Sequence, residues 1–121
     1  MVMSFDPNDY DNKLIQLVIE FYCSENLRDW SGVRRRVSKE IVSATYPGGS
    51  EVVGRDDYVR AMIEMYDGRS STFDILSIGC GCGENNVVFA EIIIEGKISI
   101  NVFEVEDGLI RREREYLGKG Y

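Results

Sequence analysis

The second half of the chain consists of short segments rich in β-branched and aromatic residues, separated by tight glycine turns. Glu95-Gly96 separates two of these segments, and Glu106-Asp107-Gly108 separates the next two. Glycine accepts the positive φ that such turns need, so neighbouring segments are expected to pair antiparallel. The pattern predicts an antiparallel meander, with strands at residues 72–78, 86–95, 97–106 and 109–117.

The first half instead shows the spacing of amphipathic helices. Leu14, Leu17, Val18 and Phe21 recur at helical intervals, which predicts a buried helical face. Because the helices precede the meander and do not alternate with strands, the class predicted is α+β. Residues that cap or break helices set the expected bounds: a helix from Asp6-Pro7 to about Leu27, a short helix begun by Asp29, a strand from Ile41 to Tyr46 stopped by Pro47-Gly48-Gly49, and a third helix from Gly54-Arg55 to Asp67-Gly68.

Residues 75–85, ILSIGCGCGEN, resemble the glycine turn of a dinucleotide- or methyl-donor-binding protein. Such a site needs the turn to lead directly into a helix, whose N-terminus holds the charged group. Here the turn leads into residues 86–95, NVVFAEIIIE, whose β-branched content predicts a strand. We therefore expect a bent hairpin connection and no cofactor at this position.

Composition limits the remaining possibilities. The chain has 121 residues, enough for one domain over residues 1–121, and a formal net charge of −7, which argues against nucleic acid and anionic membranes as partners. Its three cysteines are an odd number, which favours reduced thiols and a cytoplasmic location. Histidine is absent and Cys80 and Cys82 form only a C-x-C pair, so no metal site is expected.

The order of these elements resembles the nuclear transport factor 2-like (NTF2-like) superfamily, specifically its SnoaL-like branch. The likeness covers roughly residues 8–118 and is carried by Phe21-Tyr22, Asp29-Trp30, Gly54-Arg55-Asp56 and residues 101–117, NVFEVEDGLIRREREYL. It implies a cystatin-like α+β cone, in which three N-terminal helices pack in the concave face of a curved antiparallel sheet around a pocket. Members include ketosteroid isomerases, polyketide cyclases, limonene epoxide hydrolases, dehydratases and non-catalytic binding proteins, so the fold alone does not fix a function.

The resemblance also suggests site residues. Tyr22 and Asn101 match positions of the isomerase oxyanion hole, where each would donate a hydrogen bond to a substrate oxygen. The isomerase's catalytic aspartate would fall at Thr45-Tyr46, where no carboxylate stands, and only Glu115 matches the carboxylates of the epoxide hydrolases. Dehydratase members use histidines, which this chain lacks. The candidate substrate-binding side chains are Tyr46, Phe103, Trp30 and Ser99.

Hairpin geometry decides which side chains of residues 109–117 face the pocket. A three-residue loop with Gly108 in a bulge places Glu113 opposite Asn101 and Glu115 beside Ser99. A two-residue Asp107-Gly108 turn shifts the register by one, so that Arg112 and Arg114 face the pocket. We favour the three-residue loop, and with it Glu113 and Glu115 as acid or base groups whose pKa values are raised by apolar surroundings.

The opposite face of the predicted sheet is apolar, and three helices cannot cover both faces. It carries Val87, Phe89, Ile93, Ile98, Ile100 and Val102. We therefore expect a homodimer packed sheet to sheet. The predicted function is that of an isomerase, cyclase or epoxide hydrolase acting on a small apolar oxygenated substrate. The alternative is a non-catalytic ligand-binding or dimerisation module of the same fold.

Overall fold

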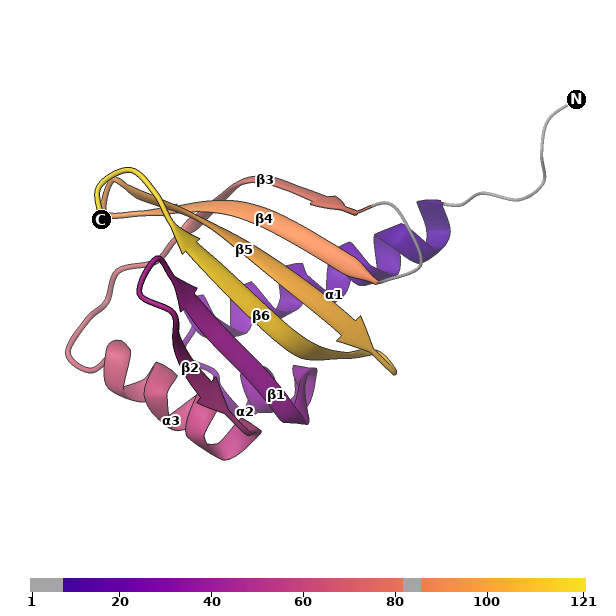
Figure 1. Cartoon of the computed structure of the whole chain (residues 1–121), viewed down its shortest axis with the longest axis horizontal. Helices are drawn as coiled ribbons and strands as arrows, with labels where there is room; N and C mark the ends of the chain where they lie inside the picture. Colours follow the sequence, from indigo (N-terminus) through magenta and orange to yellow (C-terminus); the bar gives the residue numbers. More distant parts are fainter. Residues whose placement is uncertain (1–7, 82–85) are drawn as a thin grey trace, which may run out of the picture.

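The computed structural model describes residues 8–81 and 86–121 (Figure 1). Helices fill the first part of the chain and strands the last, as the sequence pattern predicts. The elements are α1 (Asn8–Asn26), α2 (Trp30–Arg36), β1 (Val37–Tyr46), β2 (Ser50–Val53), α3 (Arg55–Met65), β3 (Asp74–Cys80), β4 (Val87–Ile94), β5 (Lys97–Glu106) and β6 (Leu109–Leu117).

One six-stranded sheet holds all the described strands in the order β2-β1-β6-β5-β4-β3. The pairs within the meander β3 to β6 are antiparallel, and so is the pair β1–β2. The pair β1–β6 is parallel, because α3 and the meander carry the chain across before β6 comes to lie beside β1. The α+β fold class is confirmed, but the sheet is mixed where the prediction had it wholly antiparallel.

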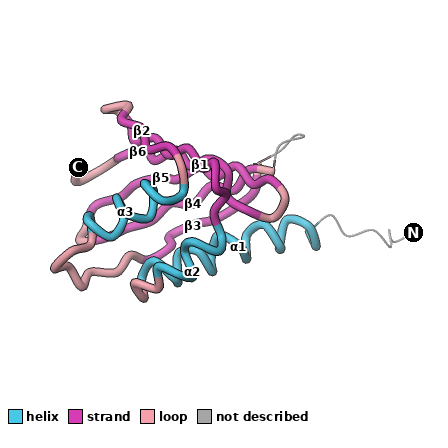
Figure 2. Tube along the Cα trace, turned by 90° about the horizontal axis from the view of Figure 1, so that it is seen from below, coloured by secondary structure: helices cyan, strands magenta, loops and turns pink. Residues whose placement is uncertain are grey.

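The three helices lie on one side of the sheet (Figure 2). Val18 and Phe21 of α1 are fully buried against inward-facing side chains of the sheet, among them Val88 and Phe103. The Phe21 and Phe103 rings meet edge to face, with centroids 5.7 Å apart. This aromatic contact anchors α1 across the middle of the sheet.

Local sequence signals account for several boundaries. The side chain of Asp29 accepts a hydrogen bond from the backbone N–H of Gly32 and so caps α2. The turn between β4 and β5 is Glu95-Gly96, with φ of 52° and 76°, which is the two-residue turn predicted. Phe103, Asn101 and Ser99 of β5 therefore lie on the same face of the sheet as their pairing partners in β4, as expected.

Other boundaries differ from the prediction. β1 begins at Val37, four residues earlier than expected, and the short strand β2 was not predicted. β3 extends through Gly79 and Cys80, where the Phe89 ring packs 3.5 Å from the position that a Cβ on Gly79 would occupy. After the glycine-rich segment the chain enters strand β4, not a helix. The predicted cap Asp6-Pro7 and residues 82–85 lie outside the described residues.

Candidate functional site

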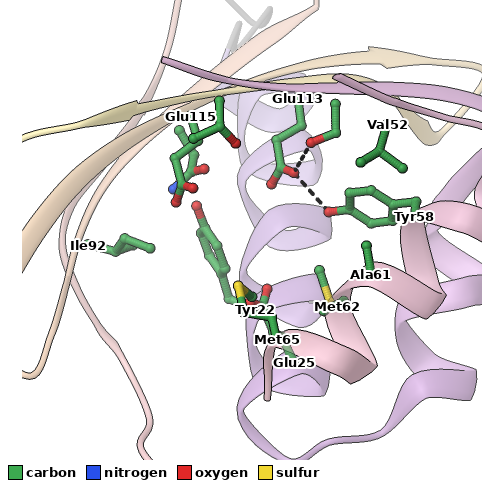
Figure 3. Close-up of a pocket in the computed structure, with 13 residues that line it drawn as sticks. Tyr22, Glu25, Val52, Tyr58, Ala61, Met62, Met65, Ile92, Glu113 and Glu115 are labelled. Carbon is green, nitrogen blue, oxygen red and sulfur yellow. Dashed lines mark hydrogen bonds between the residues drawn. The ribbon is translucent and has the colours of Figure 1, made fainter. Parts of the chain in front are cut away.

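A cavity of about 160 Å³ lies between α1, α3 and the concave face of the sheet (Figure 3). One wall is apolar and comes mainly from α3, while the other carries carboxyl, hydroxyl and amide groups. The lining side chains are Tyr22, Glu25, Ser43, Thr45, Val52, Tyr58, Ala61, Met62, Met65, Ile92, Asn101, Glu113 and Glu115. The cavity thus brings together the four side chains for which the sequence suggested catalytic roles, Glu113, Glu115, Tyr22 and Asn101.

Glu113 of β6 has the best-defined surroundings of the cavity's acids. Its Oε1 accepts hydrogen bonds from Ser43 Oγ at 3.1 Å and from the Tyr58 hydroxyl at 3.0 Å. Burial, followed by the charge of Glu115, raises the pKa of Glu113 to about 7, although the two hydrogen bonds act to lower it. A carboxyl group with this pKa is present in both protonation states near neutral pH, which suits general acid–base chemistry.

The β5–β6 hairpin determines that carboxylates face the cavity. The turn is Asp107-Gly108, with φ of 54° and 75°, so it is the two-residue turn that was not favoured. That turn alone would bring Arg112 and Arg114 to the inner face. However, the pairing changes register between Val105↔Ile110 and Glu104↔Arg112, which makes Arg111 an extra residue in β6.

This β-bulge turns the rest of β6 by one position. Glu113 consequently pairs with Phe103, and Glu115 pairs with Asn101. The three-residue loop had placed Glu113 opposite Asn101, two positions from the observed partner, but it had given the same inward face. The turn predicted was therefore wrong, while the inward orientation of the two carboxylates agrees with the structure.

Tyr22 reaches into the cavity from α1 with only 3% of its surface exposed. Among the described residues its hydroxyl accepts or donates no hydrogen bond, although the Asn101 amide lies near enough to act to lower the pKa of Tyr22. Burial, followed by the charges of Glu113, Glu25 and Glu115, raises the pKa of Tyr22 well above its usual value. Tyr22 is therefore a neutral hydrogen-bond donor whose partner has to come from the cavity.

A third carboxyl group, Glu25, enters the cavity from the last turns of α1. It is 8% exposed, and its Oε2 accepts a hydrogen bond of 2.5 Å from the Tyr66 hydroxyl. Burial is the main cause that raises the pKa of Glu25 to about 8, and the charges of Glu113 and Glu115 add to it. Glu25 is thus largely protonated near neutral pH.

Glu115 and Asn101 form the opposite end of the cavity. The buried Ser99 hydroxyl donates to Glu115 Oε2 at 3.3 Å, so Ser99 supports the acid from behind and does not line the cavity. Burial raises the pKa of Glu115 despite this hydrogen bond. Asn101 itself is 2% exposed, pairs with Glu115 across the two strands, and lies near Tyr22, whose pKa it acts to lower.

The other proposed substrate-binding residues lie outside the cavity lining. Tyr46 points to the opposite face of the sheet, where its ring stacks on Tyr116 at 5.2 Å, because Thr45 occupies the inward position of β1. Phe103 is fully buried in the core behind the cavity. Trp30 packs on the Tyr66 ring, with the ring centroids 6.0 Å apart. It therefore contacts the residue that donates a hydrogen bond to Glu25 and does not line the cavity.

Among the lining residues that sequence reasoning missed, Glu25 is a third acid, and Tyr58 and Ser43 are the hydrogen-bond donors to Glu113. A signal for Glu25 exists, because it follows Tyr22 by three residues on the buried stripe of α1 and is therefore a carboxylate where apolar residues are expected. Tyr58 lies within the predicted third helix, but the sequence gives no sign of its polar partner. Ser43 gives no signal of its own, since its role depends on the parallel pairing of β1 with β6.

The outer face of the sheet is open in the single chain. Phe89 and Ile100 are both 44% exposed, and Val102 lies between them in the middle of the face. On the neighbouring strand β6, Arg114 lies opposite Val102, and Glu104 forms ion pairs with Arg114 and Arg112. The face therefore has an apolar centre, formed by Phe89, Ile100 and Val102, with charged side chains directly beside it.

Two kinds of feature were not found within residues 8–81 and 86–121. No group of three or more Cys, Asp or Glu side chains there is arranged to hold a metal ion. In the same ranges no helix combines the length and the apolar character needed to cross a membrane.

Comparisons with known proteins show what the chain is similar to. No family model and no curated protein sequence matches it. Among solved structures, an LEH-like epoxide hydrolase of M. tuberculosis matches with a TM-score of 0.73 and 23% identity, over 90% of this chain and 85% of the other. A protein of unknown function with a cystatin-like fold from Methylobium petroleophilum PM1 matches with a TM-score of 0.75 and 15% identity, over 92% and 82%.

A third solved structure is a SnoaL-like protein of unknown function from Burkholderia thailandensis E264. It matches with a TM-score of 0.73 and 13% identity, over 88% of this chain and 96% of the other. The matches extend over most of each chain, but because the identities are 23% or lower they concern the fold alone. The chain shares the fold of these solved structures, among them a SnoaL-like protein and a protein with a cystatin-like fold, which agrees with the fold that the sequence resemblance implied.

Proposed function

We propose that the protein is a small-molecule enzyme that moves a proton on an apolar, oxygenated substrate, in a reaction of the isomerase, cyclase or epoxide-opening type. The observation that carries the proposal is the position of Glu113. Ser43 and Tyr58 donate to its Oε1, and the carboxyl group faces a cavity that also holds the unpartnered Tyr22 hydroxyl. An acid–base group and an oxygen-binding donor therefore meet in one small volume.

Each residue has a separate role in this proposal. Glu113 takes or gives the proton, and Ser43 and Tyr58 hold its carboxyl group in one orientation. The Tyr22 hydroxyl donates to the substrate oxygen and stabilises negative charge as it develops there. The Asn101 amide lies beside that hydroxyl and is a second donor. Met62, Met65 and Ile92 provide the apolar surface for the rest of the substrate.

The alternative is a ligand-binding protein of the same fold without catalysis. A cavity of about 160 Å³ is small beside the roughly 300–1,000 Å³ of typical ligand pockets, so in either case the ligand is a small molecule. Binding a small ligand needs only the shape and polarity of the cavity, whereas turnover needs the proton transfer assigned to Glu113. The two functions therefore differ in what a change at Glu113 does.

An exchange experiment distinguishes them without knowledge of the natural substrate. Small cyclic ketones are incubated with the protein in D₂O, and exchange of the protons next to the carbonyl is followed by NMR; small epoxides are tested in parallel for conversion to diols. We expect the rate to rise with pH through about 7, as Glu113 ionises to the base form. Glu113→Gln is expected to lower it by about 10²–10⁴-fold, and Tyr22→Phe by about 10²–10³-fold.

Glu106→Gln is the matched control, because Glu106 is an exposed carboxylate at the far end of β5. It removes the same charge and is expected to leave the rate unchanged. Turnover that survives Glu113→Gln at the wild-type rate contradicts the assignment of Glu113. Binding of a ketone without any exchange, or of an epoxide without diol formation, supports the non-catalytic alternative.

We also propose that the active form is a homodimer. The apolar centre of the outer sheet face exposes Phe89 and Ile100 beside Val102, and apolar side chains gathered on one open face are typical of a protein contact. A two-fold pairing of this face with itself would bury the apolar centre, while the ion pairs of Glu104 with Arg112 and Arg114 offset the charges beside it. The cavity opens on the other side of the sheet, so dimerisation leaves it accessible.

A further inference from the structure

Three carboxyl groups share the cavity, and its lining contains no cation. Glu25 comes from α1, while Glu113 and Glu115 come from β6. Of the described residues that line the cavity, none is lysine or arginine. Buried carboxylates are ordinarily paired with a positive charge, so the cavity lacks the counterion that this set of groups would need in its ionised form.

Arg28, the arginine that lies near Glu25, is occupied elsewhere. Its guanidinium donates to the backbone carbonyls of Arg69 at 3.0 Å and Ser71 at 2.7 Å. It also donates to the backbone carbonyl of Glu25 at 3.2 Å, and it lies 3.9 Å from the centre of the Tyr66 ring. The only donor to the Glu25 carboxyl group among the described residues is the neutral Tyr66 hydroxyl. Arg28 therefore fixes the chain around the cavity; its charge acts to lower the pKa of Glu25, but its guanidinium donates to the backbone carbonyl of Glu25 and not to the carboxyl group.

A second observation shows that the cavity is built for a ligand. The Tyr22 hydroxyl is buried, has no partner in the described part of the chain, and points toward the Glu115 end of the cavity (Figure 3). A buried donor without an acceptor is rare in a finished core. The acids at one wall and the free donor beside them are thus complementary to a ligand that has both a positive charge and an oxygen.

We infer that the ligand of this cavity is a small protonated amine with an apolar body, whose ammonium group replaces the missing counterion among Glu25, Glu113 and Glu115. The inference rests on the proposed function, because it names the substrate class of the same site. The ammonium group has three N–H donors, which suits carboxyl oxygens on different elements. The Tyr58 ring, Met62 and Met65 contact the apolar body, and Tyr22 donates to the substrate oxygen.

The same charges decide against other ligands. An anion would lie beside up to three carboxylates without a cation to offset them, and like charges at such distances are strongly unfavourable. A metal ion is not favoured by the geometry, since these side chains do not form a metal-binding group. A neutral ligand is compatible with the shape, but it leaves the acids unpaired, so it is expected to bind more weakly than an amine of equal size.

Three ligands of nearly equal shape test the inference: cyclohexylamine, cyclohexanol and cyclohexanecarboxylate. Their affinities for the wild-type protein are measured at about pH 7 by isothermal titration calorimetry and NMR shift perturbation. We expect the amine to bind at least ten-fold more tightly than the alcohol, and the carboxylate to be weakest. Equal affinity for amine and alcohol, or tighter binding of the carboxylate, overturns the inference and leaves the proposed function standing. Failure of all three to bind overturns the inference, whereas the proposed function is decided by the ketone and epoxide experiment described above.

Two charge-removing variants locate the ammonium group. Glu25→Gln and Glu115→Gln each keep the size of the side chain. At about pH 9, above the pKa of about 8 of Glu25, both remove a charge. There we expect both to reduce amine affinity at least ten-fold while changing cyclohexanol affinity less than two-fold. Glu20→Gln is the matched control, because Glu20 is an exposed carboxylate on the same helix as Glu25, and it should change neither affinity. Equal losses for amine and alcohol in both variants would overturn the inference, since they indicate a change of shape and not of charge.

Discussion

Replacing Glu25 with glutamine should change how stability depends on pH. In the folded protein the pKa of Glu25 is raised to about 8 from 4.5, mainly by burial. At pH values between these two pKa values, Glu25 keeps its proton in the folded protein but releases it in the unfolded chain. Unfolding therefore releases a proton, and raising the pH favours the unfolded state. The stability associated with the protonated Glu25 is complete below about pH 4.5 and is lost as the pH rises through about 8.

The size of the effect follows from the two pKa values. One pKa unit corresponds to about 1.36 kcal/mol, so the full loss between about pH 4.5 and 8 is about 5 kcal/mol. Over the practical range from about pH 5 to 7.5, the wild type should lose about 3 kcal/mol relative to Glu25→Gln. Glu113 and Glu115 are present in both proteins, and Tyr22, Tyr58 and Tyr66 titrate only at higher pH, so these groups largely cancel in the comparison.

Urea denaturation across this pH range measures the difference directly. Trp30 is the only tryptophan of the chain and packs on the Tyr66 ring that supports Glu25, so its fluorescence reports unfolding at the right place. The substitution itself can lower the free energy of unfolding by about 1–3 kcal/mol at every pH if the amide of the glutamine is left without a hydrogen-bond partner. The slope of the wild-type-minus-variant difference with pH is therefore the decisive quantity. A wild-type-minus-variant difference that stays flat from about pH 5 to 7.5 would refute the assignment of a raised pKa to Glu25. Glu20→Gln, the surface control, should give that flat line.

Two further outcomes test other parts of the structure. Ile100→Lys places a charge in the apolar centre of the outer face, so sedimentation should show a dimeric wild type and a monomeric, folded variant; a wild type that is monomeric at about 10 μM contradicts the dimer. Gly32→Ala should destabilise the protein by about 1–2 kcal/mol in thermal denaturation, despite the higher helix propensity of alanine, because its Cβ would lie 2.5 Å from Asp29 Oδ2 and from Ser24 Oγ and disturb the α2 cap. The neighbouring Ser31→Ala should stay within about 0.5 kcal/mol, and an increase in melting temperature for Gly32→Ala would disprove the steric reasoning.

Much of the fold could be predicted because local signals were strong where tertiary structure agreed with them. The strands β5 and β6 have the predicted bounds, since glycine turns and alternation mark both ends. The start of β1 could not be predicted, because Ser38-Lys39-Glu40 is polar and its pairing partner lies far along the chain. The strand β2 has only four residues, and no apolar alternation distinguishes it from a loop.

The site was partly predictable for a similar reason. Alternation along β5 placed Asn101 and Ser99 on one face, which is the inward one, and the family resemblance singled out Tyr22. The hydrogen bonds to Glu113 could not be foreseen, because Ser43 and Tyr58 approach it only through the parallel β1–β6 pairing and the docking of α3. The extra residue in β6 leaves no trace in composition or periodicity, so its position is known only from the strand pairing.

That extra residue, Arg111, has a consequence for how such a cavity can change during evolution. If the same residues paired without the bulge, the remainder of β6 would turn over, and Arg112 and Arg114 would replace Glu113 and Glu115 on the inner surface. The alternating acidic and basic side chains of this strand thus encode two opposite electrostatic interiors, and the bulge selects between them. A change that closes the bulge and keeps Arg111 in the ladder would therefore convert a relative that attracts cations into one that attracts anions.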